Sequence, residues 1–307
     1  MPKFDSHNHL IDRRLQSKPA KDPFVDLSFN RYSANDLKHD LQQYNARKAI
    51  VFPLPSESYS SRRLNRVVLE ATKQNKNLFP VAFLHPRAAP REVFRYVRQG
   101  FVGFKIYSDI SQPIATALSR IGKPVIIHPP FFPSSRLFPE MIQRLGTKVP
   151  IVLAHMGRAY NSQELAALLK AIAHKPNVFV DTSAFTAKSD TIEKIIRVLG
   201  PKRVLFGSDF PFGNLEGFQM IVDKQHLRKE HQHLSGKRIL VSEKEYAWNT
   251  PELIQLSKSL KLPQLVMHKK ASGQLFKVLL KLVRKKVLTV SDIENIFYNN
   301  AANLFKS

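Results

Sequence analysis

The chain opens with Lys3-Phe4-Asp5-Ser6-His7-Asn8-His9, a strand-like stretch that carries two histidines two residues apart. Side chains in a β-strand alternate between its two faces, so His7 and His9 share one face. Two imidazoles placed in this way can chelate a divalent metal ion. Asp5 lies on the same face, one step further back. We expect it either to form hydrogen bonds in the interior or to support a histidine ligand.

Seven further apolar runs follow this first one, with segments of helical spacing between them. Most of the runs are continuously apolar, as expected for parallel strands that are covered on both faces. Eight strands alternating with helices predict a (β/α)8 TIM barrel made by residues 1–307 as a single domain. A doubly wound open sheet is the alternative, but the glycine-rich turn typical after its first strand is absent here. The predicted strands are Lys3–His9, Ala49–Leu54, Phe79–His85, Phe101–Tyr107, Pro124–His128, Ile151–His155, Val178–Thr182 and Val204–Asp209.

The sequence changes in character after the eighth run. Residues 213–286 are more polar and basic, and they are too long for one final strand–helix unit. We interpret them as a mainly helical elaboration that serves as a lid over the barrel mouth, a homodimer contact or a contact with an anionic surface. Residues 287–307 have a helical apolar stripe and are predicted to form the closing helix, with Ser291 and Glu294 as its capping box.

Composition limits the chemistry. The 307 residues include 48 Lys plus Arg against 24 Asp plus Glu, and the net charge of +24 creates a field that attracts anions. The chain has no cysteine, which leaves nitrogen and oxygen as metal ligands. It also lacks an apolar run of about 18 residues, so no membrane span is expected. We expect a cytoplasmic protein.

Three of the later runs end at a residue that can bind a metal or move a proton. His128 ends the fifth run, His155 the sixth and Asp209 the eighth. In a barrel the carboxyl ends of all strands meet at one mouth, where barrel enzymes place their active sites. We therefore expect these three residues to lie beside His7 and His9.

This order of residues resembles the amidohydrolase superfamily. The short sequence motifs around these residues resemble its amidohydrolase-2 branch, the aminocarboxymuconate-semialdehyde decarboxylase-like family. The resemblance covers residues 1–213 and 288–307. The matching stretches are Phe4–His9, Gly100–Lys105, Ile127–Pro129, Leu153–Gly157, Leu205–Pro211 and Asn300–Phe305.

The resemblance implies a role for each of the five residues. His7, His9, His128 and Asp209 would hold one divalent metal ion, with zinc expected and manganese or iron as alternatives. His155 would lie beside the metal-bound water as acid, base or electrostatic stabiliser. Asp209 would contact both the metal and the proton of that water. A bound divalent ion lowers the pKa of its water to about 7 and polarises a carbonyl group.

Four other residues are candidate substrate contacts. Lys105 lies near the end of the fourth predicted strand, where binuclear members of the superfamily have a bridging carboxylated lysine. We favour a contact with a substrate anion or a packed, paired lysine. Arg136 and Arg158 lie in loops at the mouth, and either could bind a carboxylate with its planar guanidinium. Phe210 could line an apolar pocket or form part of ordinary rim packing.

Three functions remain open at this level. The favoured one is a hydrolase that uses a metal-activated water to attack an amide, lactone or related bond of a small, acidic substrate. The second is a metal-dependent decarboxylase of an unsaturated or aromatic acid, a lyase. The third is an inactive basic barrel that binds nucleic acid; it is disfavoured because all five site residues are present and no nucleic-acid-binding motif appears.

Overall fold

The computed structural model describes residues 1–11, 32–54, 60–159, 161–183, 189–211, 217–221, 238–241, 266–268 and 271–306. Eight parallel strands form its centre, and each pairs with the next one along the chain. Sequential order around a ring confirms the predicted barrel and excludes the doubly wound sheet, whose strand order reverses. The strands are β1 (Lys3–Leu10), β2 (Ala46–Pro53), β3 (Leu78–Phe83), β4 (Gly103–Ile106), β5 (Val125–Ile127), β6 (Ile151–Leu153), β7 (Val178–Asp181) and β8 (Val204–Leu205).

Backbone hydrogen bonds bring the end of the ring back to its beginning. The Ser6 amide donates to the carbonyl of Phe206 at 2.9 Å, and the His9 amide donates to the carbonyl of Phe210 at 2.8 Å. In the other direction, the Asp209 amide donates to the carbonyl of His7 at 2.9 Å. The segment after β8 therefore lies against β1, and the barrel is nearly closed.

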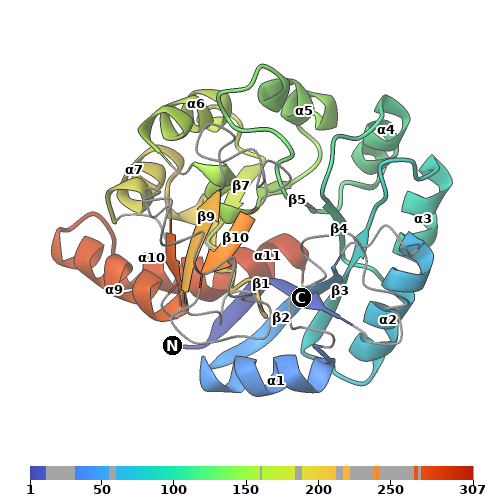
Figure 1. The fold of residues 1–307 in the computed structure, drawn as a ribbon, viewed down its shortest axis with the longest axis horizontal. Helices are drawn as coiled ribbons and strands as arrows, with labels where there is room; N and C mark the ends of the chain where they lie inside the picture. The colour runs from blue at the N-terminus through green and yellow to red at the C-terminus, as the bar shows by residue number, and fades with distance from the viewer. Residues whose placement is uncertain are drawn as a thin grey trace, which may run out of the picture.

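Helices that alternate with the strands surround the barrel (Figure 1). Their apolar residues recur at helical spacing, as in α2, where Leu64 and Val68 are buried. Several begin at a residue whose side chain accepts a backbone N–H, such as Ser33 before α1 and Asn161 before α6. The helices are α1 (Ala34–Gln43), α2 (Ser61–Lys73), α3 (Pro90–Arg98), α4 (Gln112–Ile121), α5 (Leu137–Leu145), α6 (Ser162–Ile172) and α7 (Ser189–Leu199).

A helical extension follows the barrel, as predicted. It comprises α9 (Ala271–Arg284), α10 (Val290–Glu294), a π-helical turn η7 (Asn295–Asn299) and α11 (Asn300–Phe305). The predicted capping box is wrong by two residues, because Thr289 and Asp292 have the same spacing and make the reciprocal bonds. Most of residues 213–286 lie outside the described part of the chain, so their predicted roles as lid or contact stay predictions.

Helix α11 closes the barrel at the amino-terminal ends of its strands. Ala301 and Phe305 join the cluster of side chains inside the barrel, which includes Phe4, Ile126 and Leu205. The side-chain amide of Asn300 donates to the carbonyls of Pro201 and Val204 at 2.8 Å each, at the start of β8. In the view of Figure 1, α11 is seen within the outline of the strand ring. The amino-terminal end of the barrel is thus filled, and the opposite end remains for the site.

Three short strands after β8 were not expected from the sequence. β9 (Gly217–Ile221), β10 (Arg238–Val241) and β11 (Val266–His268) form an antiparallel sheet in the order β10-β9-β11. All three lie within the polar, basic stretch 213–286. In the described part of the chain no helix has the length and apolar character needed to cross a membrane, as the composition suggested.

Candidate functional site

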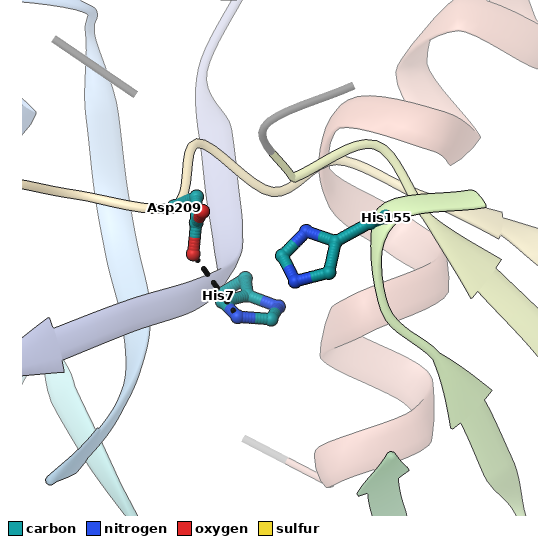
Figure 2. Close-up of side chains that lie close together, drawn as sticks. All are labelled: His7, His155 and Asp209. Carbon is teal, nitrogen blue, oxygen red and sulfur yellow. Dashed lines mark ion pairs between the residues drawn. The ribbon is translucent and has the colours of Figure 1, made fainter. Parts of the chain in front are cut away.

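The five predicted site residues all lie at the carboxyl end of the barrel. His7 and His9 belong to the second half of β1, His128 directly follows β5, and His155 and Asp209 come shortly after β6 and β8. His128 is half-buried, and the other four are nearly or fully buried. In Figure 2 the side chains of His7, His155 and Asp209 point toward one another from three separate segments.

One carboxylate oxygen links the two histidines of β1. Oδ1 of Asp209 is 3.2 Å from Nε2 of His7 and 3.2 Å from Nε2 of His9. Ligands placed about 2.0–2.1 Å from a tetrahedral zinc ion are separated from each other by about 3.3 Å. Each of the two contacts with Asp209 therefore has the separation that neighbouring ligands of one ion require.

His155 completes the compact part of the cluster. Its ligand atom and those of His7 and Asp209 all lie within 4.8 Å of one another, and such a group could hold a metal ion. His128 is not part of this compact group but contacts it through His155, because its Nδ1 is 3.0 Å from Nε2 of His155. The structure thus brings together all five residues, but it places His155 closer to the centre of the cluster than His128.

Hydrogen bonds assign the protonated nitrogens of these two imidazoles. Nδ1 of His155 is 2.9 Å from the carbonyl oxygen of Ser183, which can only accept, so Nδ1 carries the proton. Nε2 of His155 then has a lone pair and accepts from Nδ1 of His128. This leaves the lone pair of His128 on Nε2, the nitrogen that a metal could use.

The protonation state of His7 tests whether a cation fits the cluster. Burial, and then electrostatic repulsion by Lys105 and His9 that would oppose a charge on the ring, hold the pKa of His7 well below 6.5, so its ring is neutral and has one N–H. That N–H is directed at Asp181, because Nδ1 is 2.8 Å from its Oδ2. The lone pair on Nε2 then faces the carboxylate of Asp209, and a cation between these two acceptors satisfies both. The donor set fits a divalent metal.

The other imidazoles are also held in the neutral form that binds metals. Burial is the main reason that the pKa of His9 lies well below 6.5, with Lys105 acting in the same direction. Burial also lowers the pKa of His155 to about 3. At neutral pH protons therefore do not compete with a metal for these nitrogens.

Lys105 lies inside the site. Its side chain is fully buried, and Nζ is 3.5 Å from Nε2 of His7. The ammonium lies 4.8 Å from the ring centres of both Phe52 and Tyr107. Burial lowers the pKa of Lys105 to about 8, although the charges of Asp181 and Asp209 oppose the shift. A cation is thus held beside the cluster, and its predicted contact with a substrate anion stays a prediction.

Two site residues were missed in the sequence. Asp181, the last residue of β7, is fully buried and contacts His7. Tyr107, just after β4, has its hydroxyl 3.4 Å from Nδ1 of His9, and its ring stacks on that of His128. Both occur near strand ends, which is the signal that had identified His128. Asp5 forms hydrogen bonds in the interior, the first of its two predicted roles, since its Oδ1 accepts from the backbone amides of His7 and Ser208.

The remaining candidate substrate contacts lie in three different settings. Arg158 donates to the carbonyl of Pro129, in the loop after His128, at 2.9 Å. Arg136 is 89% exposed and pairs with Glu140 at 3.4 Å, so the structure does not bring it to the cluster. Phe210 is buried against Tyr44, with 5.3 Å between ring centres, which is the rim-packing alternative.

Solved structures similar to this chain share its fold. A probable 2-pyrone-4,6-dicarboxylic acid hydrolase from Acinetobacter baumannii with citric acid bound has a TM-score of 0.60 at 14% identity, and the match covers 100% of both chains. A 2,6-dihydroxybenzoate decarboxylase from Rhizobium has a TM-score of 0.58 at 16% identity, covering 100% of this chain and 99% of the other. A zinc-bound amidohydrolase from Burkholderia multivorans has a TM-score of 0.60 at 14% identity, covering 100% and 99%.

The comparison with curated proteins returned no significant match. The family model described as amidohydrolase matches residues 4–232, which include every residue of the cluster. This confirms the resemblance that the motifs indicated. The chain belongs to the amidohydrolase-2 family.

Proposed function

We propose that the chain is a metal-dependent hydrolase of a small, acidic substrate. In this proposal one divalent ion, most suitably zinc, is held by His7, His9, His128 and Asp209. The observation that carries the proposal is the convergence of both β1 imidazoles on one oxygen of Asp209, at 3.2 Å each. Similar zinc-bound and hydrolase structures support it at the level of the fold.

The chemistry divides between the ion and the side chains. A divalent ion supplies a Lewis acid that activates water and polarises a carbonyl group. The lone pair on Nε2 of His155 accepts from Nδ1 of His128 in this structure. Once that bond is released, His155 could accept a proton from the attacking water and return it to the leaving group. Asp209 is a second acceptor at the same place. The buried ring of Phe52 contacts the rings of His7 and His9 and keeps solvent from that side.

An acidic substrate is supported by the charges around the cluster. Lys105 provides a buried ammonium next to His7, and Arg158 is held near the loop that follows His128. The net charge of +24 steers anions toward the molecule. Two similar structures are named for carboxylic acids, a pyrone dicarboxylate and a dihydroxybenzoate. The second of these is a decarboxylase, which makes decarboxylation the second candidate function.

The test compares metal content and reaction products in matched variants. The double variant His7→Ala/His9→Ala is paired with His85→Ala/His174→Ala, which removes two exposed histidines outside the cluster. Wild type and control should each retain about one divalent ion per chain, whereas the cluster variant should lose it. Equal metal content in both variants would contradict the proposed site.

The reaction is then identified with lactones, amides and aromatic carboxylic acids as substrates. Hydrolysis keeps every carbon of the substrate in the products, whereas decarboxylation releases carbon dioxide. Ring-opened or cleaved products without carbon dioxide support the hydrolase. Carbon dioxide release, dependent on the same metal, assigns the chain to the decarboxylases instead.

A further inference from the structure

Asp181 occupies a central position under the cluster. It is the last residue of β7, and its side chain is fully buried. Its Oδ2 accepts the Nδ1–H of His7 from β1, at 2.8 Å. Its Oδ1 accepts the backbone N–H of His155, in the segment after β6, at 3.0 Å. One carboxylate therefore joins two functional residues that are far apart in the sequence.

Ser183 holds this carboxylate in place. The Ser183 amide donates to Oδ1 of Asp181 at 3.0 Å, and its hydroxyl also donates to Oδ1. The Ser183 carbonyl accepts from Nδ1 of His155. The turn after β7 thus fixes the orientation of Asp181 and, separately, the ring of His155.

The contact with His7 determines which nitrogen of that ring is available. A carboxylate can only accept, so it retains the proton of His7 on Nδ1 and leaves the lone pair on Nε2. Nε2 is the atom that faces Asp209. If the proton moved to Nε2, His7 would donate to Asp209 and could not bind a metal through that nitrogen.

The contact with His155 holds a strained backbone. His155 has a φ of 56° and Met156 a φ of 49°, both in the left-handed region that non-glycine residues rarely adopt. Such a conformation persists only where surrounding bonds maintain it. The hydrogen bond from the His155 amide to Asp181 is one of these, and it aims the imidazole at the cluster.

We propose that Asp181 is a positioning residue that holds His7 in the Nδ1–H tautomer as a metal ligand and holds His155 beside it. This inference rests on the proposed function, because it assumes that Nε2 of His7 binds the ion. A carboxylate that accepts from the second nitrogen of a histidine ligand raises metal affinity by about 10–100-fold in other proteins.

Asp181→Asn is the informative variant, since it keeps the shape of the side chain but presents an amide N–H to His7. The control is Asp109→Asn, which removes a carboxylate that pairs with Arg144 at 2.6 Å and not with a histidine of the cluster. Zinc affinity is measured by competition with a chelator. We expect a loss of about 10–100-fold in Asp181→Asn and a change of less than about threefold in Asp109→Asn.

A second measurement reads the tautomer directly and does not need activity. Nitrogen-15 NMR of metal-free wild type should show His7 protonated on Nδ1, and Asp181→Asn should move that proton to Nε2. If Asp181→Asn fails to fold, the wild-type spectrum alone decides, because a proton on Nε2 of His7 overturns the inference.

The two proposals fail in different ways. If wild type binds zinc and Asp181→Asn binds it equally well with an unchanged tautomer, the role of Asp181 is refuted and the proposed function stands. If wild type binds no divalent metal, the proposed function is refuted, and the assignment of Asp181 to a metal ligand is refuted with it.

Discussion

Gly207 offers a way to move the cluster without removing any ligand. It lies two residues before Asp209, where the chain passes close to β1. A Cβ atom added there would be 2.9 Å from Cβ of His7 and 3.2 Å from Cβ of Ser183, whereas ordinary contact begins near 3.4 Å. The Gly207 backbone is held by hydrogen bonds in both directions with Thr182, so in Gly207→Ala the displacement falls largely on His7.

The required shift is about 0.5 Å, which follows from the carbon–carbon separation at van der Waals contact. Metal–ligand distances tolerate only about 0.2 Å, so this shift is enough to weaken the site. Overpacking of a buried position also costs about 1–3 kcal/mol of folding stability. We therefore expect Gly207→Ala to lose at least about tenfold in zinc affinity along with some stability.

Gly103→Ala is the matched control, because it introduces a worse clash at the opposite end of the barrel. Its Cβ would be 2.7 Å from the backbone oxygen of Pro124 and 3.4 Å from the ring of Phe305. Chelator competition and thermal melting are measured on both variants. Gly103→Ala should lose at least as much stability while its folded form binds zinc normally. Zinc binding by Gly207→Ala as tight as that of wild type would refute the reasoning.

Three further predictions follow from the structure. His155→Ala should retain the metal while turnover falls by about 10²–10⁴-fold, as for loss of an acid–base group; loss of the metal would make His155 a ligand. Phe305→Ala should lower stability by about 3–5 kcal/mol with metal content unchanged, since it empties part of the barrel interior; a metal-free product would contradict this. Burial raises the pKa of Glu92, but hydrogen bonds and charges from Arg95 and Arg62 outweigh it and hold that pKa below 4.5. The ionised form therefore stabilises the fold above pH 4.5, and this contribution is lost as the pH falls below that value. Glu92→Gln should accordingly melt lower than wild type at pH 7, with a difference that shrinks in acid; a constant difference would refute the assignment.

The barrel was predictable because strands that are buried on both faces appear in the sequence as apolar runs. Most strands of the ring are continuous apolar runs, and each run ends where the chain reaches the mouth. His128, His155 and Asp209 could be recognised because they follow such runs. Asp181 ends β7 in the same way, and strand position alone would have identified it, although it is not part of the family pattern.

Other features depend on contacts that sequence spacing does not record. Arg136 was expected at the mouth, but it lies at the start of α5, where Glu140 is its neighbour one helical turn later. Whether a loop side chain points into the site depends on the helix phase and on packing with distant segments. The antiparallel sheet of β9, β10 and β11 was also missed, because its strands lie within the polar, basic stretch 213–286.

The interior of the barrel has two parts that impose opposite demands. At the amino-terminal end, Phe4, Ile126 and Phe305 fill the space with apolar side chains, and their packing requires no polar partner. At the carboxyl end, the same ring of strands excludes water from the imidazoles, and burial is the main cause that lowers the pKa of His7. A neutral ring in a dry site has only one N–H, so each histidine needs an acceptor for its proton and a cation or donor for its lone pair. Asp181 meets the first need for His7, and Asp209 lies where a shared cation would meet the second. The cluster is therefore a consequence of burial as much as of residue identity. If the five side chains were transferred to an open surface, the histidines would titrate near their ordinary pKa, and protons would compete with a metal for their nitrogens below about pH 6.5.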